Sequence, residues 1–269
     1  MQIVEFTKMH GAGNDFIMVD DRSETFPERG DLIAAFASAR TGVGCEGVIF
    51  VRNSRRADFR MVFYNPDGTE ADLCGNGARC VAAFAKRIGA VKGASMTFET
   101  RAGLVDAEIV GPGSVKVWMP EPAERKYGMA GGDYIVVGVP HFIVPVANAA
   151  KVDVEREGRE LRLSPMFAPN GTNVDFVQYI KPNKAVIRTY ERGVEAESGA
   201  CGTGAVATAV VGVEAHGMSL PMSVRSSQGY VLVVDGDYRQ AHGTGFTLTG
   251  PVKTVFEGRL DLDTLETAG

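Results

Sequence analysis

The chain has 269 residues, of which 45% are hydrophobic and 23% are charged, and its formal net charge is −5. These values are typical of a globular protein with a substantial core and exclude a disordered chain. The net negative charge gives no basis for binding nucleic acid or an anionic membrane. The sequence shows no leader-like start and no apolar run of about 18 residues or more, so we expect a cytoplasmic protein.

The first half of the chain is predicted to form strands separated by turns, with two helices. The first expected helix, 31–40, follows a break at 27–30, and the second, 78–88, follows the motif CGNG and ends at Gly89. A turn is expected at 65–68, where Pro66 and Gly68 suit the second and last positions. The expected strands are 3–9, 47–51, 58–64, 96–103, 104–110 and 114–119.

The second half repeats this order in outline. The polar segment 121–133 is the best candidate for a linker between the halves. An apolar helix, 205–216, follows the motif CGTG and ends at Gly217. A short helix or turn is expected at 156–167, strands at 134–146, 172–180 and 184–194, and hairpin patterns over 223–240 and 244–256.

The two CGxG motifs are the main internal repeat. Cys74 and Cys201 are 201 − 74 = 127 positions apart, and each follows a tyrosine-containing strand at nearly the same distance, 10 residues from Tyr64 and 11 from Tyr190. We interpret the chain as two α/β halves of one ancestral unit. The alternative is a chance similarity of two glycine-rich turns.

The helices after these motifs are predicted to be central and buried. In 78–88 the polar residues Arg79, Lys86 and Arg87 fall on one narrow stripe, and 205–216 is apolar nearly all round until Glu214. Each cysteine is therefore expected at the N-terminus of a buried helix. Cys80, inside the first helix, is expected to be a small core residue.

The cysteine pattern favours reactive thiols over structural ones. Four cysteines, including Cys45, do not make a disulfide framework in a chain of this size. No CxxC or HxxxH spacing occurs and the four histidines are scattered, so the sequence predicts no metal site.

A cysteine at a helix N-terminus is suited to proton transfer. The unpaired N–H groups and positive end of the helix dipole there bind a carboxylate and lower the pKa of a thiol. One thiolate and one thiol on opposite faces of a carbon could remove a proton and return another. This 1,1-proton transfer is the chemistry of a racemase or epimerase, and the α-carbon of an amino acid suits it.

Four segments resemble diaminopimelate epimerases over essentially the whole chain: FTKMHGAGNDF, FYNPDGTEADLCGNGARC, GTNVDFV and RTYERGVEAESGACGTGA. The resemblance implies an α/β (α+β) fold of two pseudo-symmetric halves, each with strands wrapped around a buried central helix, and an active site in the cleft between them. We place the first half at 1–119, with 253–269 as a candidate addition, and the second at 120–252. The family uses no pyridoxal phosphate and no metal, so no cofactor is expected.

The resemblance also implies roles for individual residues. Cys74 and Cys201 would be the acid/base pair that interconverts LL- and meso-diaminopimelate for lysine and peptidoglycan precursors. His141, near the first cysteine in the family, and Glu191 would assist catalysis. The residues expected to contact the substrate are Asn14, Asn65, Gly75, Asn76, Asn173, Glu191, Arg192, Gly202 and Thr203. Among these, Gly75, Asn76, Gly202 and Thr203 would offer backbone N–H groups, and Glu191 and Arg192 would hold the distal ammonium and carboxylate.

Departures from the family pattern leave the identity of the substrate open. Val139 stands where asparagine is frequent, and Glu46 stands where aspartate is usual, in a segment that often has glutamine or glycine near Gly47. A racemase of another amino acid, such as histidine, on the same scaffold is therefore the alternative function. A thiol redox or sensor protein and an anion-binding module are weaker alternatives, because redox pairs are usually local and anion binding needs no thiols. The expected partner is a small-molecule substrate, with a homodimer as a further expectation.

Overall fold

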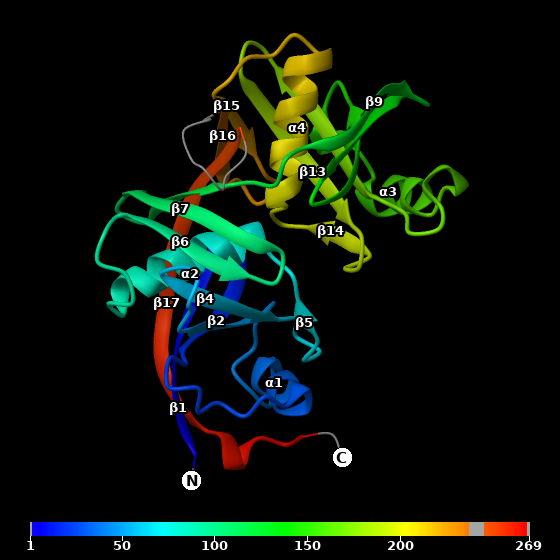
Figure 1. The fold of residues 1–269 in the computed structure, drawn as a ribbon. Helices are drawn as coiled ribbons and strands as arrows, with labels where there is room; N and C mark the ends of the chain where they lie inside the picture. Colours follow the sequence, from blue (N-terminus) through cyan, green and yellow to red (C-terminus); the bar gives the residue numbers. More distant parts are fainter. Residues whose placement is uncertain (1, 237–244, 268–269) are drawn as a thin grey trace. The chain divides into compact units, whose positions relative to one another are not determined.

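The computed structural model describes residues 2–236 and 245–267 of the chain (Figure 1). The chain divides into two compact units, which we call unit 1 (Met1–Val117 with Pro251–Gly269) and unit 2 (Trp118–Gly250). Each unit combines a mixed sheet with helices, which confirms the predicted α/β class.

Unit 1 forms its sheet from the first eight strands and the second part of β17. Its helices are α1 (Gly30–Ala37), α2 (Gly75–Arg87) and the 3₁₀-helix η3 (Leu262–Thr264). The strands are β1 (Ile3–Gly11), β2 (Asn14–Asp20), β3 (Val48–Arg52), β4 (Phe59–Tyr64), β5 (Glu70–Ala71), β6 (Ser95–Thr100), β7 (Gly103–Gly111), β8 (Ser114–Trp118) and β17 (Phe246–Asp261). Ala12 and Gly13, both with positive φ, make the tight β1–β2 turn.

Unit 2 contains the remaining elements. Its helices are α3 (Val154–Arg162), α4 (Gly202–Ala215) and the 3₁₀-helices η1 (Ala149–Lys151) and η2 (Pro165–Phe167). Its strands are β9 (Ala123–Met129), β10 (Gly132–Val137), β11 (Val139–Pro145), β12 (Asn173–Ile180), β13 (Lys184–Glu191), β14 (Ala196–Ser198), β15 (Met222–Arg225), β16 (Val231–Gly236) and the first part of β17.

The two units share one pattern of strand pairing. In unit 1 the parallel pairs are β2–β3 and β4–β6, and the short β5 pairs antiparallel with β4. In unit 2 the parallel pairs are β11–β12 and β13–β15, and the short β14 pairs antiparallel with β13. The pattern supports the duplication inferred from the sequence, because Tyr64 and Tyr190 lie at the ends of the corresponding strands β4 and β13.

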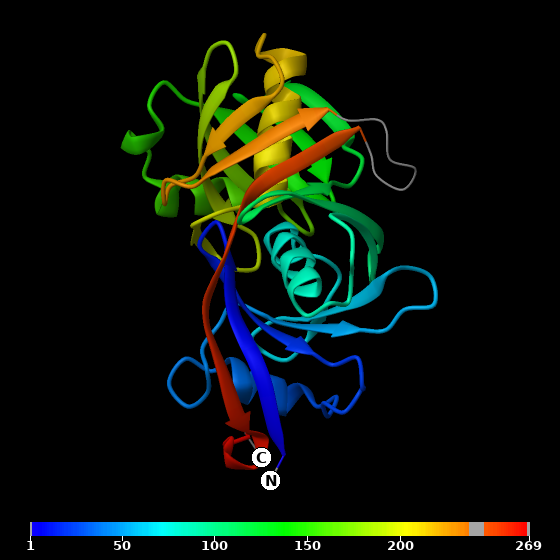
Figure 2. The same cartoon turned by 90° about the vertical axis from the view of Figure 1, so that its left-hand side faces the viewer.

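Each unit encloses one helix that begins at the second residue of a CGxG motif, three residues before its predicted start. Helix α2 packs against β1, β2, β3 and β7, and Figure 2 shows this cyan helix surrounded by strands of unit 1. Helix α4 packs against β10–β13, β15 and β16, and its residues from Gly204 to Gly212 are buried. The predicted burial of both helices is confirmed, and so is the core position of Cys80, which is 0% exposed.

The polar stripe predicted on α2 is only partly correct. Lys86 and Arg87 at the end of the helix are exposed, but Arg79 in its first turns is 0% exposed. The reason is local: the Arg79 guanidinium donates to Asn76 Oδ1 at 2.6 Å and to the Gly75 carbonyl at 3.4 Å, and these contacts replace water.

The prediction of a linker over 121–133 is wrong. Residues 123–129 form strand β9, which pairs antiparallel with β10 at three positions separated by register shifts. Almost every β9 side chain is exposed, so the strand lacks the alternation by which a half-buried strand is recognised. The positive φ of Glu124 and Gly128 further interrupts its pattern.

Two other outcomes complete the comparison. Strand β2 was not predicted, and the hairpins expected over 223–240 and 244–256 fall partly outside the described residues. The part of each that is described forms β15, β16 and β17. In the described ranges, no helix has both the length and the apolar character needed to cross a bilayer.

Candidate active site

In unit 1 the first cysteine lies at the N-terminus of the enclosed helix α2. Cys74 is the N-cap of α2, with an extended backbone, and its Sγ donates to Asn14 Oδ1 at 3.5 Å. Asn14 opens β2 and Asn76 lies in the first turn of α2, and Asn76 Nδ2 donates to the same Oδ1 at 3.2 Å. The structure therefore brings together three predicted site residues: Cys74, Asn14 and Asn76.

A buried cation lies beneath this cluster. Burial lowers the pKa of the Arg79 guanidinium, and the nearby thiols of Cys80 and Cys74 act in the opposite direction. Because Arg79 also holds Asn76 Oδ1, it fixes the amide that contacts Asn14. Arg79 was not among the predicted site residues. Its signal in the sequence was only its position five residues after Cys74 in CGNGAR.

Asn14 and Asn65, two predicted residues of unit 1, have further contacts. Asn14 Nδ2 donates to the carboxylate of Glu46, so the glutamate at this departure from the family pattern contacts a site residue. Asn65 lies in the turn after β4, where its Nδ2 donates to Thr69 Oγ1 at 3.1 Å. The contacts described for Asn65 are those of its own turn.

In unit 2 the second cysteine occupies the equivalent place. Cys201 is the N-cap of α4, and its Sγ accepts a hydrogen bond from the Gly204 N–H at 3.3 Å. The hydroxyl of Thr203 lies 3.5 Å from the same sulfur. The sequence prediction that each cysteine begins a buried helix is thus confirmed for both.

The expected lowering of the thiol pKa is wrong for Cys201. Burial raises the pKa of this thiol well above its ordinary value, and the negative charges of Glu191 and Asp175 raise it further. The Gly204 N–H acts in the opposite direction with a smaller effect. Cys201 is therefore held as a neutral thiol at neutral pH.

His141 belongs to a buried network that ends at Cys201. Its Nδ1 lies 2.7 Å from Asp175 Oδ2 and its Nε2 lies 3.0 Å from Thr203 Oγ1. His141 and Asp175 are both 0% exposed, and Thr189 donates to Asp175 Oδ1 at 2.6 Å. Within unit 2, then, His141 is connected to the second cysteine, whereas the resemblance had associated it with the first.

The sequence analysis did not single out Asp175. The sheet explains its place: β11 and β12 pair in parallel with His141 opposite Asn173, and β12 pairs with β13 with Asp175 opposite Thr189. Alternation along β12 puts Asp175 on the same face as Asn173. The signal was the spacing of two in NVD, which is informative only once β11 and β12 are known to be neighbours.

The remaining predicted residues of unit 2 lie where β12 and β13 meet the turn after β13. Asn173 Nδ2 donates to the Pro140 carbonyl at 3.0 Å, and its Oδ1 accepts from the Arg192 backbone N–H at 2.8 Å. The electrostatic neighbours of the adjacent charges differ, since Glu191 acts on Cys201 and Arg192 acts on Tyr134. The two charged groups therefore have separate surroundings.

Comparison with known proteins places the chain in a family. The family model described as diaminopimelate epimerase matches residues 6–124 and 134–255. The diaminopimelate epimerase of Aquifex aeolicus is 41% identical, covering 98% of this chain and 100% of the relative, and that of Flavobacterium psychrophilum is 37% identical, covering 93% and 97%. The chain belongs to the diaminopimelate epimerase family. Among solved structures, a PhzF-family phenazine biosynthesis protein from Bacillus anthracis shares the fold with a TM-score of 0.75 at 20% identity, covering 97% of this chain and 100% of that one.

The second glycine of each CGxG motif, in this member of the family, lies in close contact with neighbouring side chains. A Cβ at Gly204 would lie 2.8 Å from Asp175 Oδ1 and 3.2 Å from Cys201 Sγ. A Cβ at Gly77 would lie 2.9 Å from Ile49 Cδ1. These glycines let the first helical turn lie directly against the strands, which brings each cysteine close to the side chains of the sheet.

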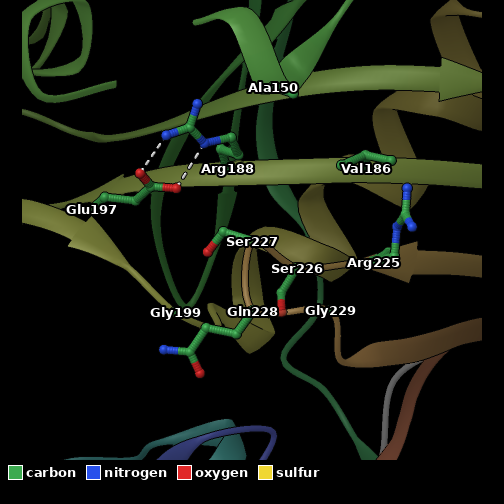
Figure 3. Close-up of a pocket in the computed structure, with 10 residues that line it drawn as sticks. All are labelled: Ala150, Val186, Arg188, Glu197, Gly199, Arg225, Ser226, Ser227, Gln228 and Gly229. Carbon is green, nitrogen blue, oxygen red and sulfur yellow. Dashed lines mark hydrogen bonds and ion pairs between the residues drawn. The ribbon is translucent and has the colours of Figure 1, made fainter. Parts of the chain in front are cut away.

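The surface of unit 2 also carries an open pocket of about 570 Å³, drawn in Figure 3. Arg188 and Glu197 form a two-bond ion pair on its wall, at 2.8 and 2.6 Å. Its lining comes from β13, β14, β15 and their neighbouring turns, and among the described residues it includes none of the predicted site residues. The pocket is therefore separate from the cluster of predicted site residues around Cys201 in the same unit.

Proposed function

We propose that the protein interconverts LL- and meso-2,6-diaminopimelate without a cofactor, by removing a proton from one face of the α-carbon and delivering another to the opposite face. One observation carries the proposal: Cys74 and Cys201 cap equivalent buried helices in two units with the same strand pairing, in a chain of the diaminopimelate epimerase family. A repeated thiol is what a reaction with two opposite proton transfers needs.

The two cysteines have different resting states in this proposal. The raised pKa of Cys201 supports its role as the acid, present as a thiol. Cys74, at the positive end of α2 and close to the cation of Arg79, would be the base. The reaction in the opposite direction exchanges the two roles.

The carboxylate on the reacting carbon would be held by the helix N-termini. The backbone N–H groups of Gly75 and Asn76 in the first turn of α2, and of Gly202 and Thr203 in the first turn of α4, are suited to an anion. Their dipoles would stabilise the negative charge that grows on the carboxylate in a carbanion-like transition state. Asn14, Asn65 and Asn173 would make further substrate contacts.

The distal end of the substrate would be recognised by charge. Glu191 would hold the distal ammonium group and Arg192 the distal carboxylate. This pair favours a substrate that carries an ammonium and a carboxylate group at each end over a substrate with one charged end. Glu191 would also assist catalysis through its charge beside Cys201. The departures at Val139, Gly47 and Glu46 leave the racemase of another amino acid as the competing assignment.

Single replacements of the cysteines test the two-base scheme. Cys74→Ala and Cys201→Ala should each lower stereoinversion by about 1000-fold or more, because each variant lacks one of the two proton-transfer groups. The measurement follows loss of the α-hydrogen in deuterium oxide by NMR and the change in optical rotation. Cys45→Ala is the matched control, since burial raises the pKa of Cys45 to about 11 and it caps no helix. A single variant that turns over near the wild-type rate would refute the scheme.

A substrate panel tests the assignment of diaminopimelate. LL-diaminopimelate, histidine and other amino acids are incubated separately with the enzyme, and Arg192→Met is compared with the wild type. We expect rapid exchange only with diaminopimelate, and a KM increase of about tenfold or more for the variant when the paired carboxylate contact is lost. Unchanged turnover of diaminopimelate by the variant would contradict the role of Arg192.

The cellular setting belongs to the same proposal. All four cysteines are free thiols in the structure, which suits a reducing compartment such as the cytoplasm. The partner is a small-molecule substrate, and we propose a homodimer as the assembly. Sedimentation of the purified protein tests the latter.

A further inference from the structure

A continuous hydrogen-bonded chain in unit 2 runs from a buried carboxylate to the second cysteine. It comprises the contacts Asp175 Oδ2–His141 Nδ1 at 2.7 Å, His141 Nε2–Thr203 Oγ1 at 3.0 Å and Thr203 Oγ1–Cys201 Sγ at 3.5 Å. The first two members are completely buried. The chain therefore has no solvent at its inner end, and its outer end is the reactive sulfur.

The carboxylate fixes one proton of this chain, and the direction of the other bonds follows when the His141 ring is neutral. An ionised Asp175 can only accept, so His141 must carry a proton on Nδ1. In the neutral ring Nε2 is then an acceptor, and the single hydroxyl hydrogen of Thr203 is donated to it. The Thr203 oxygen is left to accept from the S–H of Cys201. The resting arrangement is thus a thiol, a hydroxyl and a neutral imidazole oriented the same way.

Such an orientation resolves a difficulty in the two-base scheme. Burial and two nearby carboxylates hold Cys201 as a thiol, yet the reaction must also run in the direction in which Cys201 removes the proton. The buried imidazole of His141, which the Thr203 hydroxyl connects to this sulfur, is a base placed to take that proton. We propose that Thr203 and His141 form a proton relay that converts Cys201 between thiol and thiolate, with Asp175 as the positioning residue that fixes the His141 tautomer. This inference rests on the two-base function proposed above.

The proton transfer balances within the chain. The S–H bond of Cys201 breaks as a new O–H bond forms at Thr203, while the original Thr203 O–H bond breaks and an N–H bond forms at His141 Nε2. The products are a Cys201 thiolate and a His141 imidazolium. The Asp175 carboxylate stabilises that imidazolium at 2.7 Å, and the reverse transfer restores the resting state.

The position of Asp175 is set independently of the relay. Thr189 donates to its other oxygen at 2.6 Å from the opposing strand, and Gly204 leaves room for that oxygen beside α4. The hydrogen bond from Thr189 therefore provides a control for variants of Asp175, because it contacts the oxygen that does not face His141. Removing it perturbs the same carboxylate on the side away from His141.

Thr203→Val is the principal test, because valine keeps the shape and the backbone N–H but removes the hydroxyl that joins His141 to Cys201. The probe is iodoacetamide at neutral pH, with alkylation of Cys201 and Cys74 followed in the same molecule by peptide mass spectrometry. We expect the rate at Cys201, relative to Cys74, to fall about tenfold, because the sulfur loses its base. For diaminopimelate, kcat should fall by about 100-fold with KM changed less than about threefold.

Two further variants complete the design. Asp175→Asn should lower kcat and should shift the ¹⁵N NMR signals of His141 away from those of the Nδ1–H tautomer. The change of tautomer is an effect that a purely structural role of Asp175 would not produce. Thr189→Val is the matched control and should leave both the tautomer and the alkylation ratio as in the wild type.

The outcomes separate the relay from the wider proposal. Unchanged Cys201 alkylation and unchanged kcat in Thr203→Val would overturn the relay, even if Asp175→Asn did not fold. An enzyme inactive on diaminopimelate but with the expected alkylation and NMR changes would contradict only the substrate assignment.

Discussion

Cys74 and Cys201 occupy equivalent positions, but the charges around them have opposite sign. Cys74 shares its surroundings with the buried guanidinium of Arg79, whereas Cys201 lies near the carboxylates of Asp175 and Glu191. A duplicated unit has thus kept the position of its sulfur while the electrostatic environment diverged. In the proposed reaction, two identical residues would then act as one acid and one base because their surroundings differ.

Removing the charge of Glu191 should make Cys201 more acidic. Because this negative charge raises the pKa of Cys201, Glu191→Gln should lower that pKa, increase the thiolate fraction at a given pH and move the alkylation profile of Cys201 to lower pH. The measurement is the iodoacetamide rate across neutral and alkaline pH. Glu195→Gln is the matched control. Glu195 lies in the turn that follows Glu191, but its carboxylate pairs with Arg162 at 3.0 Å. An equal shift in both variants would contradict a specific effect of Glu191.

Gly204→Ala should destabilise the protein despite the higher helix propensity of alanine. That propensity favours alanine by about 1 kcal/mol, but the new Cβ would lie 2.8 Å from Asp175 Oδ1 and force the first turn of α4 away from the sheet. We expect a net loss of about 1–3 kcal/mol in the free energy of unfolding, measured by urea denaturation. Gly111→Ala is the control, because a Cβ there meets open space. Equal stability of the two variants would show that Gly204 is not needed for packing.

At the scale of elements, α4 carries an unsatisfied group that can be removed. Thr208 is 0% exposed, and its hydroxyl makes no hydrogen bond with any residue in the described part of the chain. Thr208→Val keeps the shape and retains the backbone carbonyl that accepts from Tyr179 at 3.0 Å. We expect stability to rise by about 1 kcal/mol with unchanged kcat, measured by thermal unfolding and turnover. A loss of stability would indicate that the hydroxyl is satisfied in solution.

Helices with clear ends were the elements best predicted from the sequence. Helices α2 and α4 each begin at the second residue of a CGxG motif and end just before a glycine with positive φ, Gly89 and Gly217, so local chemistry specifies them. Strand β9 could not be predicted, because pairing with β10 defines it and its exposed side chains do not alternate. A strand that is held mainly by backbone hydrogen bonds, with its side chains exposed, has no hydrophobic alternation from which the sequence could predict it.

The site shows the same division between local and distant causes. The positions of Cys74 and Cys201 follow from motifs within a few residues of them. Asp175 is 34 residues from His141 and acquires its role through the register of parallel strands. The sign of the Cys201 pKa shift likewise depends on burial, which the helix-dipole argument from the sequence did not include.

At the scale of the whole molecule, unit 2 is one uninterrupted segment. It contains its own enclosed helix, and the described contacts of the proposed relay lie within it. We expect the polypeptide 118–250 to fold alone with a cooperative thermal transition, followed by circular dichroism. It should not turn over diaminopimelate, because it lacks Cys74. The absence of a cooperative transition would show that unit 2 depends on the rest of the chain.

Because of strand β17, unit 1 needs residues from both ends of the described sequence before it can fold completely. Unit 1 needs residues 251–269, and β1 pairs with β17 from Val252 to Asp261. During synthesis unit 1 therefore stays incomplete, with β1 unpaired along one edge, until residues 251–269 have been made. Exposed strand edges favour association between chains. A released polypeptide cut before residue 251 would contain all of unit 2 and would leave β1 of unit 1 with an exposed edge that favours association.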